Sequence, residues 1–250
     1  MRWLIGGLSL IWAQQSVRDS SIRFFLISVG YHGMFPQLDM AQRFGYSSTV
    51  GGEVGYKTRL GLYTVLQGGG LIGDKIVEKG FLEGLYLPSF QKAGQLAFID
   101  ESGKIFAPAL RQRGWMATFR IGYIFRWLRL PWQNPNCGPY VEVGAGYLSH
   151  RILIDKARSE RLPLLEGEYL KGLDRLTAGW GFMQSVGYRF FSNNGLINFV
   201  IGVELAQYFT QSLRGYVYDL GVRDDARRRD FWWGIRAGWS LPLYEKAAME

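Results

Sequence analysis

The residues with the clearest capacity for chemistry are two histidines. His32 and His150 are the only histidines in the chain, and Ser149 and Asp155 lie close to His150. These are the residue types of a Ser-His-Asp hydrolase, in which the histidine activates the serine and an acid orients the histidine. Neighbouring residues of a strand point to opposite faces, however, so a strand here would separate Ser149 from His150. Both histidines fall near the outer ends of their predicted strands, at the rim. We favour a non-catalytic role for both and keep a lipid-modifying enzyme at the outer rim as an alternative.

The sequence offers no pattern for a metal or a cofactor. Two isolated histidines lack the spacing of a ligand set. The single cysteine, Cys137, excludes an internal disulfide and a multi-cysteine metal site. We therefore predict no metal and no cofactor.

The composition favours many strands and a membrane interface. Apolar residues make up 48% of the chain, and it contains 33 Gly, 14 Tyr, 9 Trp and 16 Phe. No internal run approaches the roughly 18 apolar residues of a spanning helix. This criterion does not apply to a transmembrane barrel, because its strands are apolar only at alternate positions. The net charge of +8 suits an anionic membrane surface or an acidic partner. No basic cluster is interleaved with base-stacking aromatics, so we predict no nucleic-acid binding.

The N-terminal segment has the layout of a secretory signal. "MRWLIGGLSLIWAQQ" places Arg2 before an apolar run that ends at Ala13. We predict a signal peptide over residues 1–13 and a single domain over 14–250. A buried N-terminal strand or helix is the alternative.

A three-residue motif recurs along the chain: an aliphatic residue, a glycine, then Tyr or Trp. Its copies begin at Val29, Val54, Ile121, Ala145, Ala178, Val186 and Ala237. Each copy lies in a segment of period 2, with the glycine on the small or polar face and the aromatic on the apolar face. This phase predicts strands at about 22–34, 46–56, 61–73, 115–127, 139–153, 176–190, 196–209 and 231–244. We predict a closed eight-stranded antiparallel up-and-down transmembrane β-barrel.

The predicted connections alternate in length. Short turns follow the second, fourth and sixth strands, and longer loops follow the others, the longest over 74–114. Short periplasmic turns and long outer loops are typical of outer-membrane barrels, and an even strand number returns both termini to the periplasm. The longest loop contains "FLEGLYLPSF" and "QLAFIDESGKIFAPAL". We expect so apolar a loop to carry strand extensions or to pack on a partner.

The face opposite the apolar one carries ionisable residues that should fill the lumen. They are Glu53, Arg120, Arg126, Glu142, Arg189, Glu204 and Arg236. An eight-stranded barrel is just wide enough for its side chains to fill, and unpaired buried charges would be costly. We predict a plug of salt bridges, with inward glycines making room for the long side chains.

The apolar face should meet lipid. The predicted lipid-facing aromatics are Tyr31, Tyr56, Phe119, Tyr123, Trp127, Tyr147, Trp180, Tyr188, Trp233 and Trp239. They fall near both strand ends, as aromatic girdles do. In the last long loop, Arg223, Arg227, Arg228 and Arg229 are predicted contacts for lipopolysaccharide phosphates or an acidic partner, with a solvated loop as the alternative.

The sequence resembles the small eight-stranded outer-membrane barrels of Bacteroidota. The segments that carry the resemblance are "GEYLKGLDRLTAGWGFMQSVGYRFF", "NFVIGVELAQYFTQSLRGYVYDL" and "RRRDFWWGIRAGWSLPLY". The resemblance covers the mature chain and implies the bacterial outer membrane, with no catalytic residues to carry over. Some barrels of this kind are accessory subunits of secretion or assembly complexes.

We therefore predict a non-enzymatic outer-membrane barrel that acts through its outer loops. Its predicted partners are outer-membrane lipid, lipopolysaccharide and a larger outer-membrane protein complex. Two alternatives stay open at this point: a lipid A-modifying enzyme that uses His150 or His32, and a soluble lipocalin-like carrier of an apolar ligand.

Overall fold

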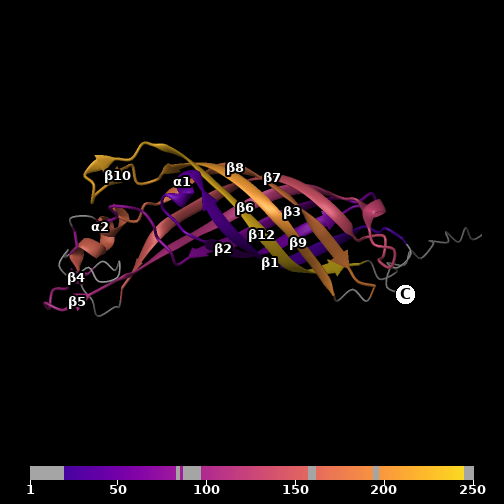
Figure 1. Cartoon of the computed structure of the whole chain (residues 1–250), viewed down its shortest axis with the longest axis horizontal. Coiled ribbons are helices and arrows are strands. Elements are labelled where there is room, and N and C mark those ends of the chain that lie inside the picture. The colour runs from indigo at the N-terminus through magenta and orange to yellow at the C-terminus, as the bar shows by residue number, and fades with distance from the viewer. Residues whose placement is uncertain (1–19, 83–84, 87–96, 157–161, 194–196, 245–250) are drawn as a thin grey trace, which may run out of the picture.

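The chain forms one closed barrel of eight antiparallel strands (Figure 1). The computed structural model describes residues 20–82, 85–86, 97–156, 162–193 and 197–244. The barrel strands are β1 (Phe24–Gln37), β2 (Ser47–Lys57), β3 (Leu62–Gly73), β6 (Ala109–Ile124), β7 (Gly138–Asp155), β8 (Thr177–Phe191), β9 (Asn198–Ser212) and β12 (Arg227–Leu243). Each pairs with the barrel strands before and after it in the chain, and β1 closes the barrel against β12. The predicted fold is confirmed.

Two strands begin earlier than the sequence pattern predicts. β6 starts at Ala109 and stays paired with β7 up to Asp155, and β12 starts at Arg227, opposite Gln211 of β9. The predicted loop residues 109–114 and 227–230 are therefore strand residues that extend the barrel wall.

The smaller elements lie in the connections. They are α1 (Leu38–Ala41), β4 (Phe98–Ile99), β5 (Ile105–Phe106), the 3₁₀ helices η2 (Arg126–Leu128) and η3 (Pro163–Leu165), α2 (Gly167–Lys171), β10 (Tyr216–Val217) and β11 (Val222–Arg223). Figure 1 shows α2, β4, β5 and β10 together at one end of the barrel, which we call the long-loop end. The opposite end carries the short turns, the start of β1 and the end of β12, and we call it the terminal end.

The strand pairing sets the tilt of the barrel. From Tyr147, the paired residues lead across β8 and β9 to Arg229 of β12. In the other direction they lead across β6, β3, β2 and β1 to Trp239 of the same strand. This offset is the stagger that closure of a tilted barrel requires.

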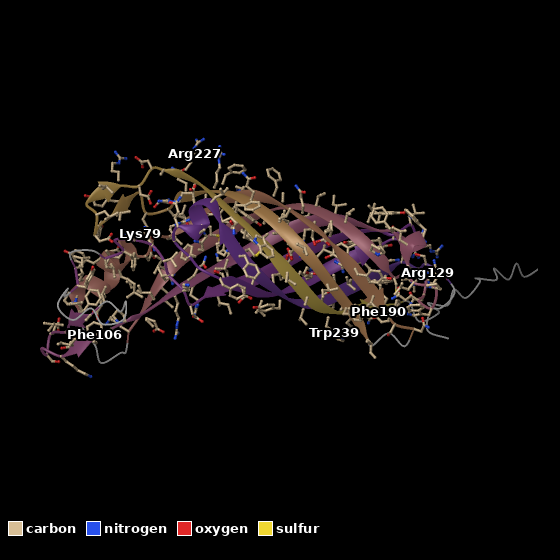
Figure 2. All side chains as sticks on the ribbon, in the orientation of Figure 1. Lys79, Phe106, Arg129, Phe190, Arg227 and Trp239 are labelled. Carbon is tan, nitrogen blue, oxygen red and sulfur yellow. The ribbon has the colours of Figure 1, made fainter. Side chains whose placement is uncertain are left out.

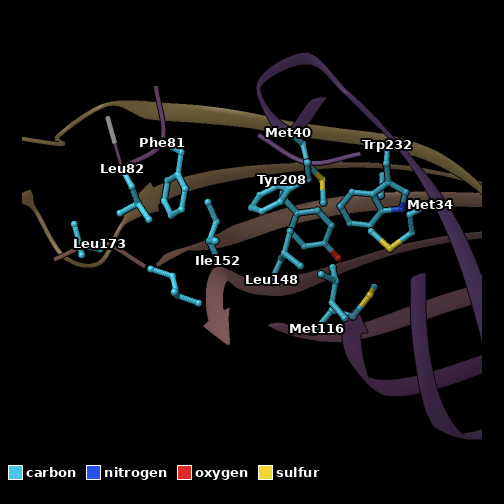
Figure 3. Packing of buried hydrophobic residues seen from close by; sticks show 14 of the residues in the cluster. Met34, Met40, Phe81, Leu82, Met116, Leu148, Ile152, Leu173, Tyr208 and Trp232 are labelled. Carbon is cyan, nitrogen blue, oxygen red and sulfur yellow. The ribbon is translucent and has the colours of Figure 1, made fainter. Parts of the chain in front are cut away.

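The interior is layered along the barrel axis. An apolar cluster that includes Phe24, Ile124 and Tyr140 fills the terminal end. A larger one runs from Met34 and Trp232 in the barrel to Phe81 in the loops of the long-loop end (Figure 3). The charged residues of the lumen lie between these two apolar layers.

Successive side chains of each strand point alternately to the outer wall and to the interior. Apolar side chains such as Phe119, Val143 and Ile201 are exposed on every second strand position. Among the described residues, no helix is long and apolar enough to cross a membrane. The barrel therefore has apolar side chains outside and charged side chains inside. A soluble carrier of apolar ligands would have the reverse distribution.

Candidate functional site

The lumen contains a network of three carboxylates and three guanidinium groups. They belong to Glu53, Glu142 and Glu204 and to Arg120, Arg189 and Arg236. Arg120 and Arg236 each bridge Glu53 and Glu142, with N–O distances from 2.6 to 2.9 Å. Arg189 is 3.3 Å from Glu142. These side chains are almost completely buried. Their formal charges balance, which is how a barrel interior can hold so many ions.

Neighbouring polar groups join this network. Tyr63 donates a hydrogen bond of 2.8 Å to Glu142, and the Arg189 guanidinium lies 4.5 Å from the centre of the Tyr63 ring. Glu204 is 3.9 Å from Arg120 and also binds Nδ1 of His32. The predicted ionisable residues Glu53, Glu142 and Glu204 thus meet Arg120, Arg189 and Arg236 in one cluster.

Gln67 and Glu204 bind the two ring nitrogens of His32. The Gln67 Oε1 atom accepts hydrogen bonds from Arg120 and Thr118, so its amide nitrogen is the group that faces His32 Nε2, at 2.8 Å. Glu204 binds the other ring nitrogen, Nδ1. His32 is a lumen residue and does not lie at the rim, where the strand phase predicted it.

Glycines make room for the long side chains. A Cβ atom at Gly144 would lie 2.6 Å from Cγ of Arg120, and one at Gly122 would overlap the Tyr63 ring. Side chains at these inward positions would displace members of the network.

One predicted lumen residue lies elsewhere. Arg126 belongs to η2, beyond the last residue of β6, and has no ion pair within the described ranges. The prediction failed because it extended the strand alternation to residue 127, whereas the strand ends at Ile124. Trp127 likewise lies in η2, where it is exposed.

The predicted lipid-facing aromatics lie on the outer wall, apart from Trp127 in its turn. Two of them, Tyr147 and Trp180, contact each other with ring centroids 5.3 Å apart. Trp115, which the prediction did not include, lies 5.6 Å from the Tyr147 ring on its other side. Trp239 and Phe190 lie toward the terminal end (Figure 2).

His150 is enclosed at the long-loop end of the lumen. Its Nε2 atom is 2.9 Å from Asp230, which also accepts hydrogen bonds from Arg43 at 2.8 Å and Thr210 at 2.6 Å. Phe44 packs edge-on against the imidazole. Arg43 and Phe44 follow α1, so this connection covers the barrel mouth.

The surroundings of His150 do not support hydrolysis. The ring is fully buried, and no serine hydroxyl binds either histidine among the residues described. Thr177 is the hydroxyl residue nearest to the ring, at 3.3 Å. No group of three metal-ligating side chains occurs in the described part of the chain.

A second ion network joins the loops at the long-loop end, and the sequence pattern gave no sign of it. Arg175, just before β8, binds both oxygens of Asp219 in the β10–β11 loop at 2.7 Å and Glu78 in the loop after β3 at 2.8 Å. Burial alone would lower the pKa of Arg175, but these two carboxylates outweigh burial and raise it. Nearby, Asp174 accepts bonds of 3.0 and 2.6 Å from Arg214.

The backbone at these loop contacts is strained. Arg175 and Leu82 have positive φ angles of 52° and 59°, which costs about 1–2 kcal/mol for each residue. Asp219 binds both of them, the Arg175 guanidinium and the Leu82 amide. Loops from three parts of the chain are therefore held in one specific arrangement.

Apolar side chains remain exposed on this arrangement. They lie around the β10–β11 hairpin and on α2: Leu213, Tyr216, Tyr218, Leu220, Val222 and Tyr169. We call them the hairpin patch. The rings of Tyr169 and Tyr218 are 6.3 Å apart, so the patch is continuous between the two loops.

The four arginines predicted to contact phosphates separate into three environments. Arg228 points inward and binds Asp224 at 2.6 Å, so it is not available on the outer face. Arg223 is in β11, 3.5 Å from Asp225. Arg227 and Arg229 are exposed on the outer side of β12, and Figure 2 shows Arg227 directed away from the barrel.

These features define a closed eight-stranded barrel with a membrane-type outer wall and a filled lumen. Its fold is similar to that of Neisserial surface protein A (NspA), with a TM-score of 0.46 and 8% sequence identity over 88% of this chain and 97% of that one. For the outer membrane protein OprG from Pseudomonas aeruginosa the values are 0.40 and 12%, over 91% and 100%. Ail, the attachment invasion locus protein of Yersinia pestis, in complex with the heparin analogue sucrose octasulfate, gives 0.39 and 11%, over 88% and 99%. Each likeness is one of fold. No protein-family model and no curated protein matches the chain.

Proposed function

We propose that this protein is a bacterial outer-membrane barrel that conducts nothing and acts as a structural or accessory subunit of an envelope complex. The short turns and both termini face the periplasm, and the long loops face outward. The predicted signal peptide and the resemblance to Bacteroidota barrels support this location. Secretion and assembly machineries are the kinds of complex for which such a subunit is suited.

The apolar outer wall supports the membrane location. Strand residues at alternate positions expose aliphatic and aromatic side chains around the barrel, as lipid requires. The charge-balanced network of Glu53, Glu142, Arg120 and Arg236 supports a closed lumen, because it fills the cross-section with buried side chains.

The observation that carries the accessory role is the hairpin patch. Its side chains are exposed although the loops beneath them are fixed by Arg175, Asp219 and Glu78. A fixed, exposed apolar patch is typical of a docking surface, because a partner can bind it without first ordering the loops.

The experiment is a detergent pull-down of the tagged full-length protein from outer membranes, with fractionation to establish location. A variant carrying Tyr216→Ser, Tyr218→Ser and Leu220→Ser removes the apolar character of the hairpin patch. The matched control, Leu60→Ser with Trp132→Ser, changes exposed apolar residues at the terminal end.

We expect wild type and control to retain one stoichiometric membrane partner, and the patch variant to lose it. Isolation of the wild-type barrel alone, or retention of the partner by the patch variant, would contradict docking through this patch. Recovery outside the membrane fraction would contradict the proposed location.

A further inference from the structure

Two arginines on the outer wall of β12 have no side-chain ion pair among the described residues, although the backbone N–H of Arg229 donates a hydrogen bond of 2.7 Å to Asp39. The strand alternation turns Arg228 and Asp230 inward, and leaves Arg227 and Arg229 exposed on the other side. No carboxylate lies within ion-pair distance of either guanidinium among the residues described. Their positions are two residues apart on one face, about 7 Å along the strand.

Other outward arginines at the long-loop end do have such partners. On β6, Arg111 is 2.9 Å from Asp155 and Arg113 is 3.7 Å from Asp74. On β7, Arg151 is 3.6 Å from Asp174. The β12 pair therefore differs from these arginines, because neither of its guanidinium groups has an ion pair in the described part of the chain.

The pair lines a groove that lies next to an apolar one. Arg227 and Arg229 face Gln211 and Phe209 of β9 across the strand pair, and all four residues line the first groove. Phe209 and Gln211 also line a second groove on the wall of β7, β8 and β9. Its other lining residues include Ala145, Tyr147, Ala178, Trp180, Phe182 and Leu213.

The two adjacent grooves together have the polarity of an amphiphile. Ala145 and Ala178 are small, and Trp180 and Phe182 are exposed beside them. The second groove can thus take a hydrocarbon chain on the membrane-facing side of the barrel. The arginines lie beyond Phe209 toward the long loops, where a lipid headgroup would be.

We propose that these grooves bind a lipid with a phosphate-bearing headgroup, with its phosphate on Arg227 and Arg229 and one acyl chain along the Ala145–Trp180 groove. Guanidinium groups bind phosphate through paired charge-assisted hydrogen bonds. The apolar groove selects an acylated ligand over free phosphate. The proposal rests on the membrane location proposed above, and its grooves share only Leu213 with the hairpin patch.

The test is native mass spectrometry of the full-length barrel in detergent, with bisphosphorylated lipid A and its dephosphorylated counterpart as probes. We compare wild type with Arg227→Gln/Arg229→Gln and with the control Arg111→Gln/Arg151→Gln. Wild type and control should prefer the phosphorylated lipid at least tenfold. The β12 variant should bind both lipids equally. A shift between folded and heat-denatured bands on a gel verifies that each variant folds.

A second variant tests the acyl groove. Ala145→Phe should fill it and weaken binding of bisphosphorylated lipid A at least fivefold, while leaving Arg227 and Arg229 untouched. An unchanged phosphate preference in the β12 variant would overturn the proposal. So would full binding by Ala145→Phe, or displacement of the lipid by inorganic phosphate at equal concentration. Because binding is measured in detergent, these results are independent of the fractionation that tests location.

Discussion

Two arginine–carboxylate networks stabilise different parts of this molecule. In the lumen, Arg120 and Arg236 bridge Glu53 and Glu142 between strands of one barrel. At the long-loop end, Arg175 joins Asp219 and Glu78 from separate loops. The chemistry is the same, and most of these side chains are buried. The difference lies in what else holds the partners in place.

The lumen residues are positioned by strands with complete backbone pairing, whereas the loop residues have little secondary structure around them. β10 and β11 are paired strands of only two residues each, as are β4 and β5. Isolated strand pairs of this size are unstable in water. Loss of a lumen ion should therefore lower the free energy of global unfolding. Loss of a loop ion should mainly permit local opening.

The largest effect is expected from Arg236→Ala. This change leaves Glu53 and Glu142 with one fewer cation in a fully buried site. Removal of one partner of a buried ion pair costs about 3–5 kcal/mol, measured here as the free energy of unfolding in denaturant with the barrel in lipid vesicles. The control is Arg223→Ala, whose side chain is 80% exposed. A loss below about 1 kcal/mol would show that the lumen network does not stabilise the barrel.

A smaller effect is expected from Gln67→Leu, which removes hydrogen bonds without removing charge. Arg120, Thr118 and His32 each lose a partner inside the lumen. Buried polar groups left unsatisfied cost about 1–3 kcal/mol. The matched control is Gln184→Leu on the exposed outer face of β8, where removal of the amide should not destabilise the barrel in lipid. Equal losses in the two variants would contradict the positioning role of Gln67.

The contrast between the networks also explains what the sequence could predict. Strand alternation placed Glu142 and Arg236 inside the barrel because a period of 2 fixes which side chains face inward. It placed Arg126 wrongly because alternation does not indicate where a strand ends. No comparable period exists in loops, so the partners Arg175 and Asp219, separated by 44 residues, left no signal. His32 was predicted at the rim because the predicted strand ended at residue 34, whereas β1 continues to Gln37.

Arg175→Met separates local from global stability. The substitution removes the cation that binds Asp219. The free energy of local opening at Leu82 and the β10–β11 loop should therefore fall by about 1–2 kcal/mol. Their backbone amides should exchange hydrogen correspondingly faster. Hydrogen exchange resolved by mass spectrometry measures this, while global unfolding should change less. Lys171→Met is the control, since Lys171 pairs with Glu168 at an exposed site. Uniformly faster exchange through the barrel strands would show that the loop network contributes to global stability.

The smallest effect is expected from Arg111→Gln, which removes an outward ion pair with Asp155. Both side chains are more than 40% exposed, and such surface pairs contribute about 0–1 kcal/mol. The measurement is the denaturant midpoint at low and at high salt, because screening should remove what little stabilisation exists. The N–O distance of 2.9 Å is the same as that between Arg236 and Glu142 in the lumen. A loss as large as that of Arg236→Ala would therefore mean that contact geometry, and not burial, determines the strength of arginine–carboxylate pairs in this barrel.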